Sequence, residues 1–182
     1  MRTQRLVFSG SGGQGVITAA IILAESAALN EGLYAVQSQT YGPAARGGAT
    51  RTDVIISDDN ILYPKVTTPN ILVCLTQEAY EKYGNTLRPG GIMLTDSRYV
   101  TVGDNEDARH VSLPMYATVM ERIGKPVVFN ICMLGALLAL ADLDVKPESI
   151  MESLKKRLPE HLMDINRQAL EVGYELGLSH TN

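Results

Sequence analysis

A glycine-rich segment near the N-terminus carries the pattern with the clearest chemical meaning. Its residues are Gly10, Ser11, Gly12, Gly13, Gln14 and Gly15. Three of the glycines have the spacing G-x-G-x-x-G, which between a strand and a helix lets the backbone turn sharply and approach a ligand closely. A helix that begins after such a turn directs free N–H groups and the positive end of its dipole at the ligand. The segment therefore predicts a site for an anionic ligand, most often a phosphate.

The residues on either side of this turn supply the required context. The apolar pattern predicts a strand at residues 4–9, a helix at residues 14–30 and a second strand at residues 33–38. Gly32 stands where a helix C-terminus favours glycine. These elements form a βαβ unit, for which we expect parallel pairing of the two strands and a right-handed crossover.

The turn permits three interpretations. A site of the NAD type needs an acidic residue at the end of the second strand, about 20 residues after the turn. Residues 33–39 contain no carboxylate, and no Walker-type lysine followed by Ser or Thr is present either. The turn is then either a packing device that lets the helix approach the strand, or a site for another anionic ligand, including one shared with a partner chain.

A second loop, rich in Gly, Pro and Ala, follows the predicted second strand. It contains Tyr41, Arg46 and Gly47. Ligands of open α/β sheets bind at the edge formed by the carboxyl ends of the strands, so this loop is expected beside the glycine turn. Arg46 is placed to meet an anion there. Its simpler interpretation is a solvent-exposed loop arginine.

The remainder of the chain alternates between strands and helices. Apolar runs predict strands at residues 49–57, 71–75, 92–95 and 111–113. Helical patterns cover residues 77–83, 116–122, 131–141, 148–158 and 161–176. Thr76 and Asn130 precede two of these helices and are expected to cap them. The order of elements predicts an α/β fold, with a single Rossmann-like domain over residues 1–182 and a mostly parallel sheet that carries helices on both faces.

The bulk properties narrow the class of protein. A chain of 182 residues is long enough for one domain with a substantial core. Its net charge of −4 argues against a general nucleic-acid binder, since no basic excess is present to neutralise phosphates. No apolar run is long enough to span a membrane, and the N-terminus lacks the apolar region of a signal peptide. We therefore expect a cytoplasmic protein with neither a membrane nor a nucleic-acid partner.

The chain offers few residues suited to catalysis. Cys74 and Cys132 lie in apolar runs and are expected to be buried, inert thiols. No C-x-x-C motif occurs, so the chain has no ligand set for an iron–sulfur cluster or a structural zinc. Asp96 follows a predicted strand and could act as a base, but without a partner the role of a turn residue is favoured. We expect a ligand-binding domain with no catalytic residue and no metal site of its own.

Several motifs taken together carry a family resemblance. They are Gly10–Val16, Tyr41–Pro43, Arg46–Gly48, Val54–Ser57 and Asn130 followed by Leu134–Ala136. In their order and spacing the chain resembles the gamma subunits of 2-oxoacid:ferredoxin oxidoreductases over nearly its whole length. Within that family it is most similar to the gamma subunits that act with 2-oxoglutarate.

The resemblance implies a subunit of a 2-oxoglutarate synthase, an enzyme that decarboxylates a 2-oxoacid oxidatively, reduces ferredoxin and forms an acyl-coenzyme A. It implies alpha, beta and ferredoxin-like delta subunits as partners, and ferredoxin as a partner of the complex. Thiamine diphosphate and iron–sulfur clusters are then held by other subunits, with coenzyme A as co-substrate and no cofactor bound by this chain alone.

The resemblance also implies a site. The residues from Ser11 to Gly15 would face the active-site or coenzyme A cleft, with Tyr41, Arg46 and Gly47 along it. Two alternatives remain open on the sequence: a purely structural subunit, and a gamma subunit for pyruvate, branched-chain 2-oxoacids or indolepyruvate.

Overall fold

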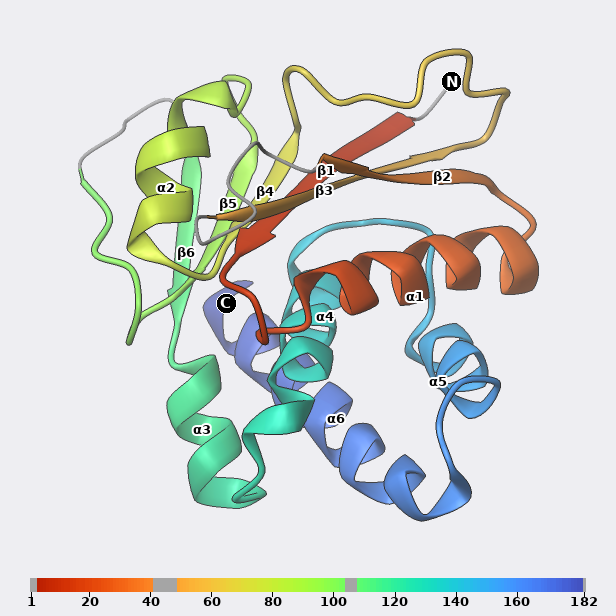
Figure 1. Cartoon of the computed structure of the whole chain (residues 1–182), viewed down its shortest axis with the longest axis vertical. Coiled ribbons are helices and arrows are strands. Elements are labelled where there is room, and N and C mark those ends of the chain that lie inside the picture. The colour runs from red at the N-terminus through yellow and green to blue at the C-terminus, as the bar shows by residue number, and fades with distance from the viewer. Residues whose placement is uncertain (1–2, 41–48, 104–107, 182) are drawn as a thin grey trace.

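A computed structural model describes residues 3–40, 49–103 and 108–181 and shows one six-stranded sheet with the order β2-β3-β1-β4-β5-β6 (Figure 1). The strands are β1 (Thr3–Gly10), β2 (Tyr34–Thr40), β3 (Thr50–Ser57), β4 (Ile71–Cys74), β5 (Ile92–Asp96) and β6 (Arg109–Leu113). The helices are α1 (Val16–Asn30), α2 (Gln77–Tyr83), α3 (Met115–Arg122), α4 (Phe129–Leu140), α5 (Pro147–Lys155) and α6 (Met163–Thr181), with short 3₁₀ turns η1 (Gly84–Thr86), η2 (Pro126–Val128) and η3 (Glu160–Leu162).

The sheet is mostly parallel, as the sequence predicts, but the first βαβ unit is not built as expected. β1, β4, β5 and β6 pair in parallel, whereas β3 pairs antiparallel with both β1 and β2. β1 and β2 therefore run in the same direction without touching, and the prediction that they pair directly is wrong. β3 instead runs antiparallel to both strands and occupies the position between them, where it pairs with each along its length.

Helices cover both faces of the sheet, which confirms the predicted fold class. The larger core lies between one face and α1, α3, α4, α5 and α6, and includes Leu6, Phe8, Val54 and Val73. The alternate strand residues Val7, Ile55, Leu72 and Cys74 face the other side, where Ala79 of α2 packs against them. This alternation follows from the two-residue period of a strand that is buried on both faces.

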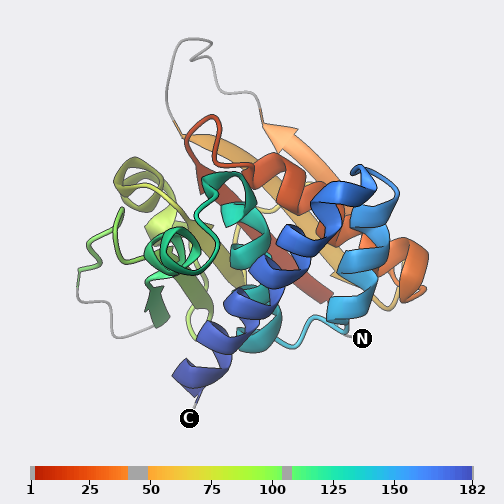
Figure 2. The ribbon, with the colours of Figure 1, turned by 90° about the horizontal axis from the view of Figure 1, so that it is seen from below.

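α6 packs on the side of α4 that faces away from the sheet and crosses beneath it in Figures 1 and 2. Glycines allow the two helices to approach very closely. A Cβ at Gly135 would lie 2.1 Å from the carbonyl oxygen of Leu170, and one at Gly173 would lie 1.8 Å from that of Cys132. No side chain fits at either position, so α4 is enclosed between the sheet and α6.

Local signals in the sequence account for several helix ends. The Thr76 hydroxyl accepts a hydrogen bond from the N–H of Ala79 at 3.2 Å, which confirms the predicted cap of α2. Gly32 follows α1 with φ of +69°, a conformation that favours glycine. Across the described residues, no helix has both the length and the apolar character that crossing a bilayer requires.

Candidate functional site

The glycine turn lies at the carboxyl edge of the sheet, between the end of β1 and the start of α1 (Figure 1). Gly13 and Gly15 have φ values of +88° and +70°. L-residues with side chains avoid this region, so both positions require glycine for the backbone to turn. Gly12 has open space around its Cα, with no atom within 4 Å of an added Cβ. The turn thus presents bare backbone to solvent.

Gln14 closes the turn with its side-chain amide. Its Oε1 accepts a hydrogen bond from the N–H of Ser11 at 2.8 Å, and its Nε2 donates to the carbonyl of Leu75 at 3.0 Å. Leu75 follows β4, so this one side chain ties the turn to the neighbouring strand. A Cβ at Gly10 would lie 2.5 Å from the same Oε1, which explains the first glycine of the motif by packing.

Asn130 reaches the turn from α4. The sequence predicts it as the cap of the helix at residues 131–141, but α4 already begins at Phe129 and Val128 occupies the cap position. The prediction of a cap is therefore wrong. Its Nδ2 instead donates to the carbonyl of Gly15 at 3.3 Å and occupies the space that a Cβ on Gly15 would need, 2.7 Å away.

The N-terminus of α1 keeps its hydrogen-bond donors free. The cap residue is Gly15, which has no side chain to bond them, and the first intrahelical bond is from the N–H of Ala19 to the carbonyl of Gly15 at 2.9 Å. The N–H groups of Val16, Ile17 and Thr18 therefore have no acceptor within the helix. Together with the helix dipole they favour an anion at this point.

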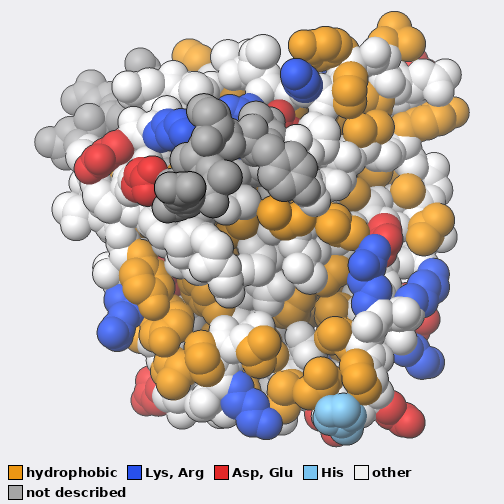
Figure 3. Space-filling view, in the orientation of Figure 1, with side chains coloured by type: hydrophobic (Ala, Val, Ile, Leu, Met, Phe, Trp, Pro, Cys, Tyr) orange, Lys and Arg blue, Asp and Glu red, His pale blue; other side chains and the backbone are white. Residues whose placement is uncertain are grey.

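An apolar hollow of ≈ 250 Å³ opens beside the turn. Gly13, Gly15 and Asn130 form the wall nearest the turn, and Ile22 and Leu154 belong to the apolar lining. Figure 3 shows apolar side chains gathered over the lower part of the same face, around α3. The glycine turn thus borders a hollow with a mostly apolar lining.

The second predicted loop leaves the sheet next to this turn. Tyr41, Arg46 and Gly47 lie outside the described residues, so their predicted roles remain predictions. The flanks of the loop are described: Thr40 pairs with Arg51, and Thr50 pairs with Gly10 at the end of β1. The described flanks of the second loop and the glycine turn therefore lie at one edge of the sheet.

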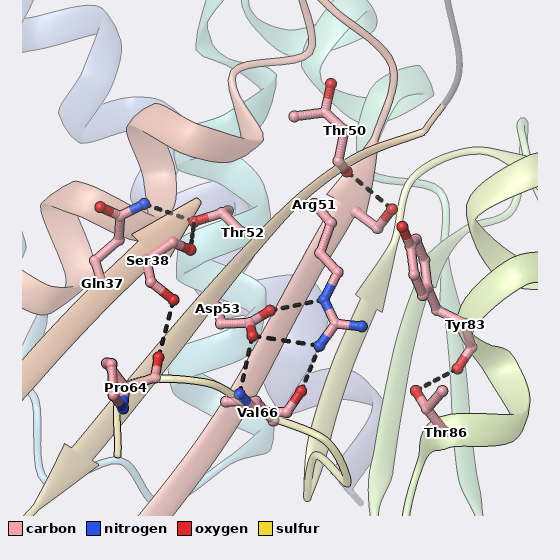
Figure 4. Close-up of polar contacts among 11 residues, drawn as sticks. Gln37, Ser38, Thr50, Arg51, Thr52, Asp53, Pro64, Val66, Tyr83 and Thr86 are labelled. Atoms are coloured by element: carbon pink, nitrogen blue, oxygen red, sulfur yellow. Dashed lines mark hydrogen bonds and ion pairs between the residues drawn. The ribbon is translucent and has the colours of Figure 1, made fainter. Parts of the chain in front are cut away.

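A buried ion pair anchors β3 just after this loop (Figure 4). The Nε of Arg51 donates to Asp53 Oδ1 at 2.8 Å, and the side chain of Asp53 is only 3% exposed. Arg51 also donates to the carbonyl of Val66, whose N–H donates to Asp53 Oδ2 at 2.9 Å. The Tyr83 ring lies 5.1 Å from the guanidinium carbon of Arg51. The network fixes the segment around Val66 against the strand.

The remaining residues considered in the sequence, Asp96, Cys74 and Cys132, are buried. Asp96 accepts from the N–H of Arg98 at 2.9 Å and from that of Tyr116 at 2.7 Å, which confirms its role as a turn residue. Burial raises its pKa, while those backbone bonds act in the opposite direction. Burial also raises the pKa of the Cys74 and Cys132 thiols to about 12, so both are inert as predicted.

Comparison with known proteins identifies the family of this chain. A family model described as pyruvate ferredoxin/flavodoxin oxidoreductase matches residues 5–176. The chain belongs to this family. The 2-oxoglutarate synthase subunit KorC of Methanocaldococcus jannaschii is 42% identical over 170 residues, which cover 92% of this chain and 90% of that relative. The predicted resemblance is confirmed.

Solved structures of oxidoreductase subunits have the same fold. The gamma subunit of a keto/oxoacid ferredoxin oxidoreductase from Geobacter sulfurreducens superposes with a TM-score of 0.89 at 38% identity and covers 98% of both chains. A 2-oxoglutarate:ferredoxin oxidoreductase from Magnetococcus marinus, solved with 2-oxoglutarate, coenzyme A and succinyl-CoA, has a TM-score of 0.87. It is 22% identical and covers 98% of this chain and 32% of that longer chain, so this likeness concerns the fold alone.

For this oxidoreductase family member, sequence reasoning missed two features of the site. The pairing of Arg51 with Asp53 was detectable, because residues two apart on a strand point to the same face. The contact of Asn130 with Gly15 was not, since 115 residues separate them in the chain. Asn130 supports the turn, and the Arg51–Asp53 pair holds the segment around Val66 against β3.

Proposed function

We propose that the chain is the gamma subunit of a 2-oxoglutarate:ferredoxin oxidoreductase, and that its glycine turn binds the phosphate groups of coenzyme A. The observation that supports this role is the uncapped start of α1 at Gly15, which leaves the donors of the first helical turn without side-chain acceptors. Phosphate is the anion that such a terminus recognises most often. Residues 1–182 would act as one domain.

The other residues of the site have supporting roles in this proposal. Gly12 and Gly13 present free backbone N–H groups to the ligand, while Gly10, Ser11, Gln14 and Gly15 shape the turn. Tyr41, Arg46 and Gly47 would belong to the same site, with Arg46 contributing a bidentate contact to a phosphate or a carboxylate. If a complex with Arg46→Ala shows the same dependence of rate on coenzyme A concentration as the wild type, Arg46 is not part of the site.

We assign the redox chemistry to partner subunits. A cluster needs thiolate ligands, whereas burial raises the pKa of both cysteines of this chain to about 12. Among the described residues, no three His, Cys, Asp or Glu side chains gather to hold a metal. This chain does not fit a cluster, and thiamine diphosphate with the clusters would belong to the alpha, beta and delta subunits. What this chain supplies is binding and orientation of a co-substrate.

The proposal is tested on the native protein, purified gently and without oxygen. We expect larger subunits that carry thiamine diphosphate and iron to co-purify with the chain. The complex should reduce ferredoxin with 2-oxoglutarate and coenzyme A faster than with pyruvate, branched-chain 2-oxoacids or indolepyruvate. A chain that elutes alone and gains no activity from such subunits would contradict the proposal.

The alternative of a purely structural subunit makes a different prediction for the same complex. Substitutions in the glycine turn that preserve assembly would then leave turnover unchanged. If the turn binds coenzyme A, the same substitutions raise the KM for coenzyme A while the subunits still co-elute. Size-exclusion chromatography and steady-state kinetics on one preparation distinguish the two.

A further inference from the structure

We propose that Gln14 and Asn130 are positioning residues, two amide side chains that hold the glycine turn in its ligand-binding shape without using the donors that the ligand needs. The inference rests on the proposed function for its ligand, coenzyme A. Its structural basis is the set of hydrogen bonds that the two amides make on opposite sides of the turn.

Gln14 acts on the side of the turn that faces β4. Its amide uses both ends, accepting from Ser11 N–H and donating to the carbonyl of Leu75 at 2.8 and 3.0 Å. Neither Glu nor Met can do both, because a carboxylate has no donor and a thioether has neither an N–H nor a strong acceptor. Gly10 leaves room for this arrangement, since any Cβ there would collide with Oε1.

Asn130 acts on the side that faces α4. Its Nδ2 donates to the carbonyl of Gly15 at 3.3 Å, and that carbonyl also accepts from Ala19 N–H at 2.9 Å. The side chain of Asn130 fills the space next to the Gly15 Cα, and only 8% of the residue is exposed. α4 thereby fixes the point at which α1 begins.

The two amides have one property in common that an ordinary cap lacks. A Ser, Thr or Asp at the cap position accepts from the N–H groups of the first helical turn and so occupies them. Here two of the three bonds go to carbonyls, and the third uses only Ser11 N–H. Within the described residues, the N–H groups of Gly12, Gly13 and Val16 have no acceptor. The turn is held in place while its donors stay open.

The test uses the whole complex and two neutral variants, Gln14→Met and Asn130→Ala. Both remove hydrogen bonds without adding a charge to the anion site. We expect the Kd for coenzyme A, measured by titration calorimetry without 2-oxoacid, to rise about tenfold, the equivalent of one lost hydrogen bond. The KM for 2-oxoglutarate should stay within about twofold of wild type, since the effect is local to the turn.

Gln37→Met and Asn30→Ala are matched controls. The Gln37 amide donates to the Thr52 hydroxyl at 2.7 Å, and that of Asn30 to the Ser149 carbonyl at 3.0 Å, so each control also loses an amide hydrogen bond away from the turn. We expect both to keep the wild-type Kd for coenzyme A. Variants at Gln14 and Asn130 that melt earlier but retain the wild-type Kd would overturn the proposal, because that pattern is purely structural.

Amide hydrogen exchange of peptides that span residues 9–20 separates this proposal from the proposed function. In Gln14→Met, Ser11 N–H loses its acceptor and should exchange faster. In Asn130→Ala, Ala19 N–H, which donates to the Gly15 carbonyl, should exchange faster. Wild-type protein that binds no coenzyme A would refute the ligand but leave this exchange result to decide the positioning role. Unchanged exchange in both variants would refute the positioning role whatever the ligand.

Discussion

Glycines have two different structural roles in this protein, one in the turn after β1 and one between α4 and α6. Around Gly12 there is open space, and Gly13 needs glycine for its φ of +88°. At Gly135 and Gly173, backbone carbonyls of the facing helix lie about where a Cβ would be, 2.1 and 1.8 Å away. The turn uses glycine to expose backbone, and the helix pair uses it to bury backbone.

Glycines with open space around them serve binding, and glycines packed against backbone serve stability. Where a glycine packs against backbone atoms, an added methyl group can be accommodated only if the two helices move apart. Its substitution therefore affects the whole fold. A glycine with open space affects only what approaches from outside. Gly15 combines both features, because it has a positive φ and also contacts a side chain of α4. Alanine substitutions at the buried glycines, at Gly15 and at Gly12 should therefore separate the effect on stability from the effect on ligand binding.

Gly173→Ala should have the largest effect. Its new Cβ would lie 1.8 Å from Cys132 O and 2.9 Å from Ala136 N, both of them backbone atoms. The helices must separate, and we expect a loss of about 3 kcal/mol or more in the free energy of unfolding, measured by denaturant titration. Gly177→Ala, with its nearest backbone atom at 2.7 Å, should lose less. Equal losses would show that the close approach is not the cause.

Gly15→Ala should be intermediate. An alanine with φ near +70° carries a strain of about 1–2 kcal/mol, and the Asn130 amide 2.7 Å away must also move. Gly32→Ala is the matched control, since it has φ of +69° and nothing within 4 Å. Thermal unfolding should therefore show a greater loss at Gly15 than at Gly32. The same loss at both positions would mean that the Asn130 contact contributes nothing to stability.

Gly12→Ala should barely change stability, by less than about 0.5 kcal/mol, because nothing lies within 4 Å of the added methyl group and φ is not in the left-handed region. The substitution should instead weaken ligand binding, since a methyl group keeps a phosphate away from the backbone N–H groups. We expect a several-fold higher Kd for coenzyme A in the complex. A variant with the wild-type Kd would remove Gly12 from the binding surface.

Glu25→Gln changes no glycine and no residue of the turn, and it gives a reference at a partly exposed ion pair. Glu25 on α1 pairs with Arg157 after α5, and 34% and 41% of their side chains are exposed. The hydrogen bond from Arg157 lowers the pKa of Glu25 from its ordinary value of 4.5. A lowered pKa in the folded state stabilises the fold above that ordinary value and stops doing so as the pH falls through the folded-state pKa.

We therefore expect Glu25→Gln to cost at most about 1 kcal/mol at pH 7, as exposed pairs do. The difference between variant and wild type should shrink at acidic pH, when the carboxyl group of the wild type is protonated. Denaturant titrations at pH 7 and at acidic pH measure this. A loss that stays constant with pH would mean that the ion pair is not its source.

The elements of the fold could be predicted better than their pairing. Val7 and Ile55 belong to apolar runs that identify their strands in any arrangement, and Pro147 marks the start of α5. The position of β3 could not be predicted in this way. The sequence of the βαβ unit is equally compatible with direct pairing of β1 and β2, and only the hairpin geometry puts Thr50 opposite Gly10.

The glycine turn, the family and the expectation of an anion at α1 could all be inferred from the amino-acid sequence, because each rests on residue types and their spacing. Tertiary structure decided what holds the turn. Asparagine is a residue type that commonly caps helices, yet Asn130 donates to the carbonyl of Gly15 because α4 packs beside α1. It also decided which glycines are buried, since Gly173 and Cys132 meet only once the helices have packed. Contacts between residues far apart in the chain depend on the global packing, which no local pattern encodes.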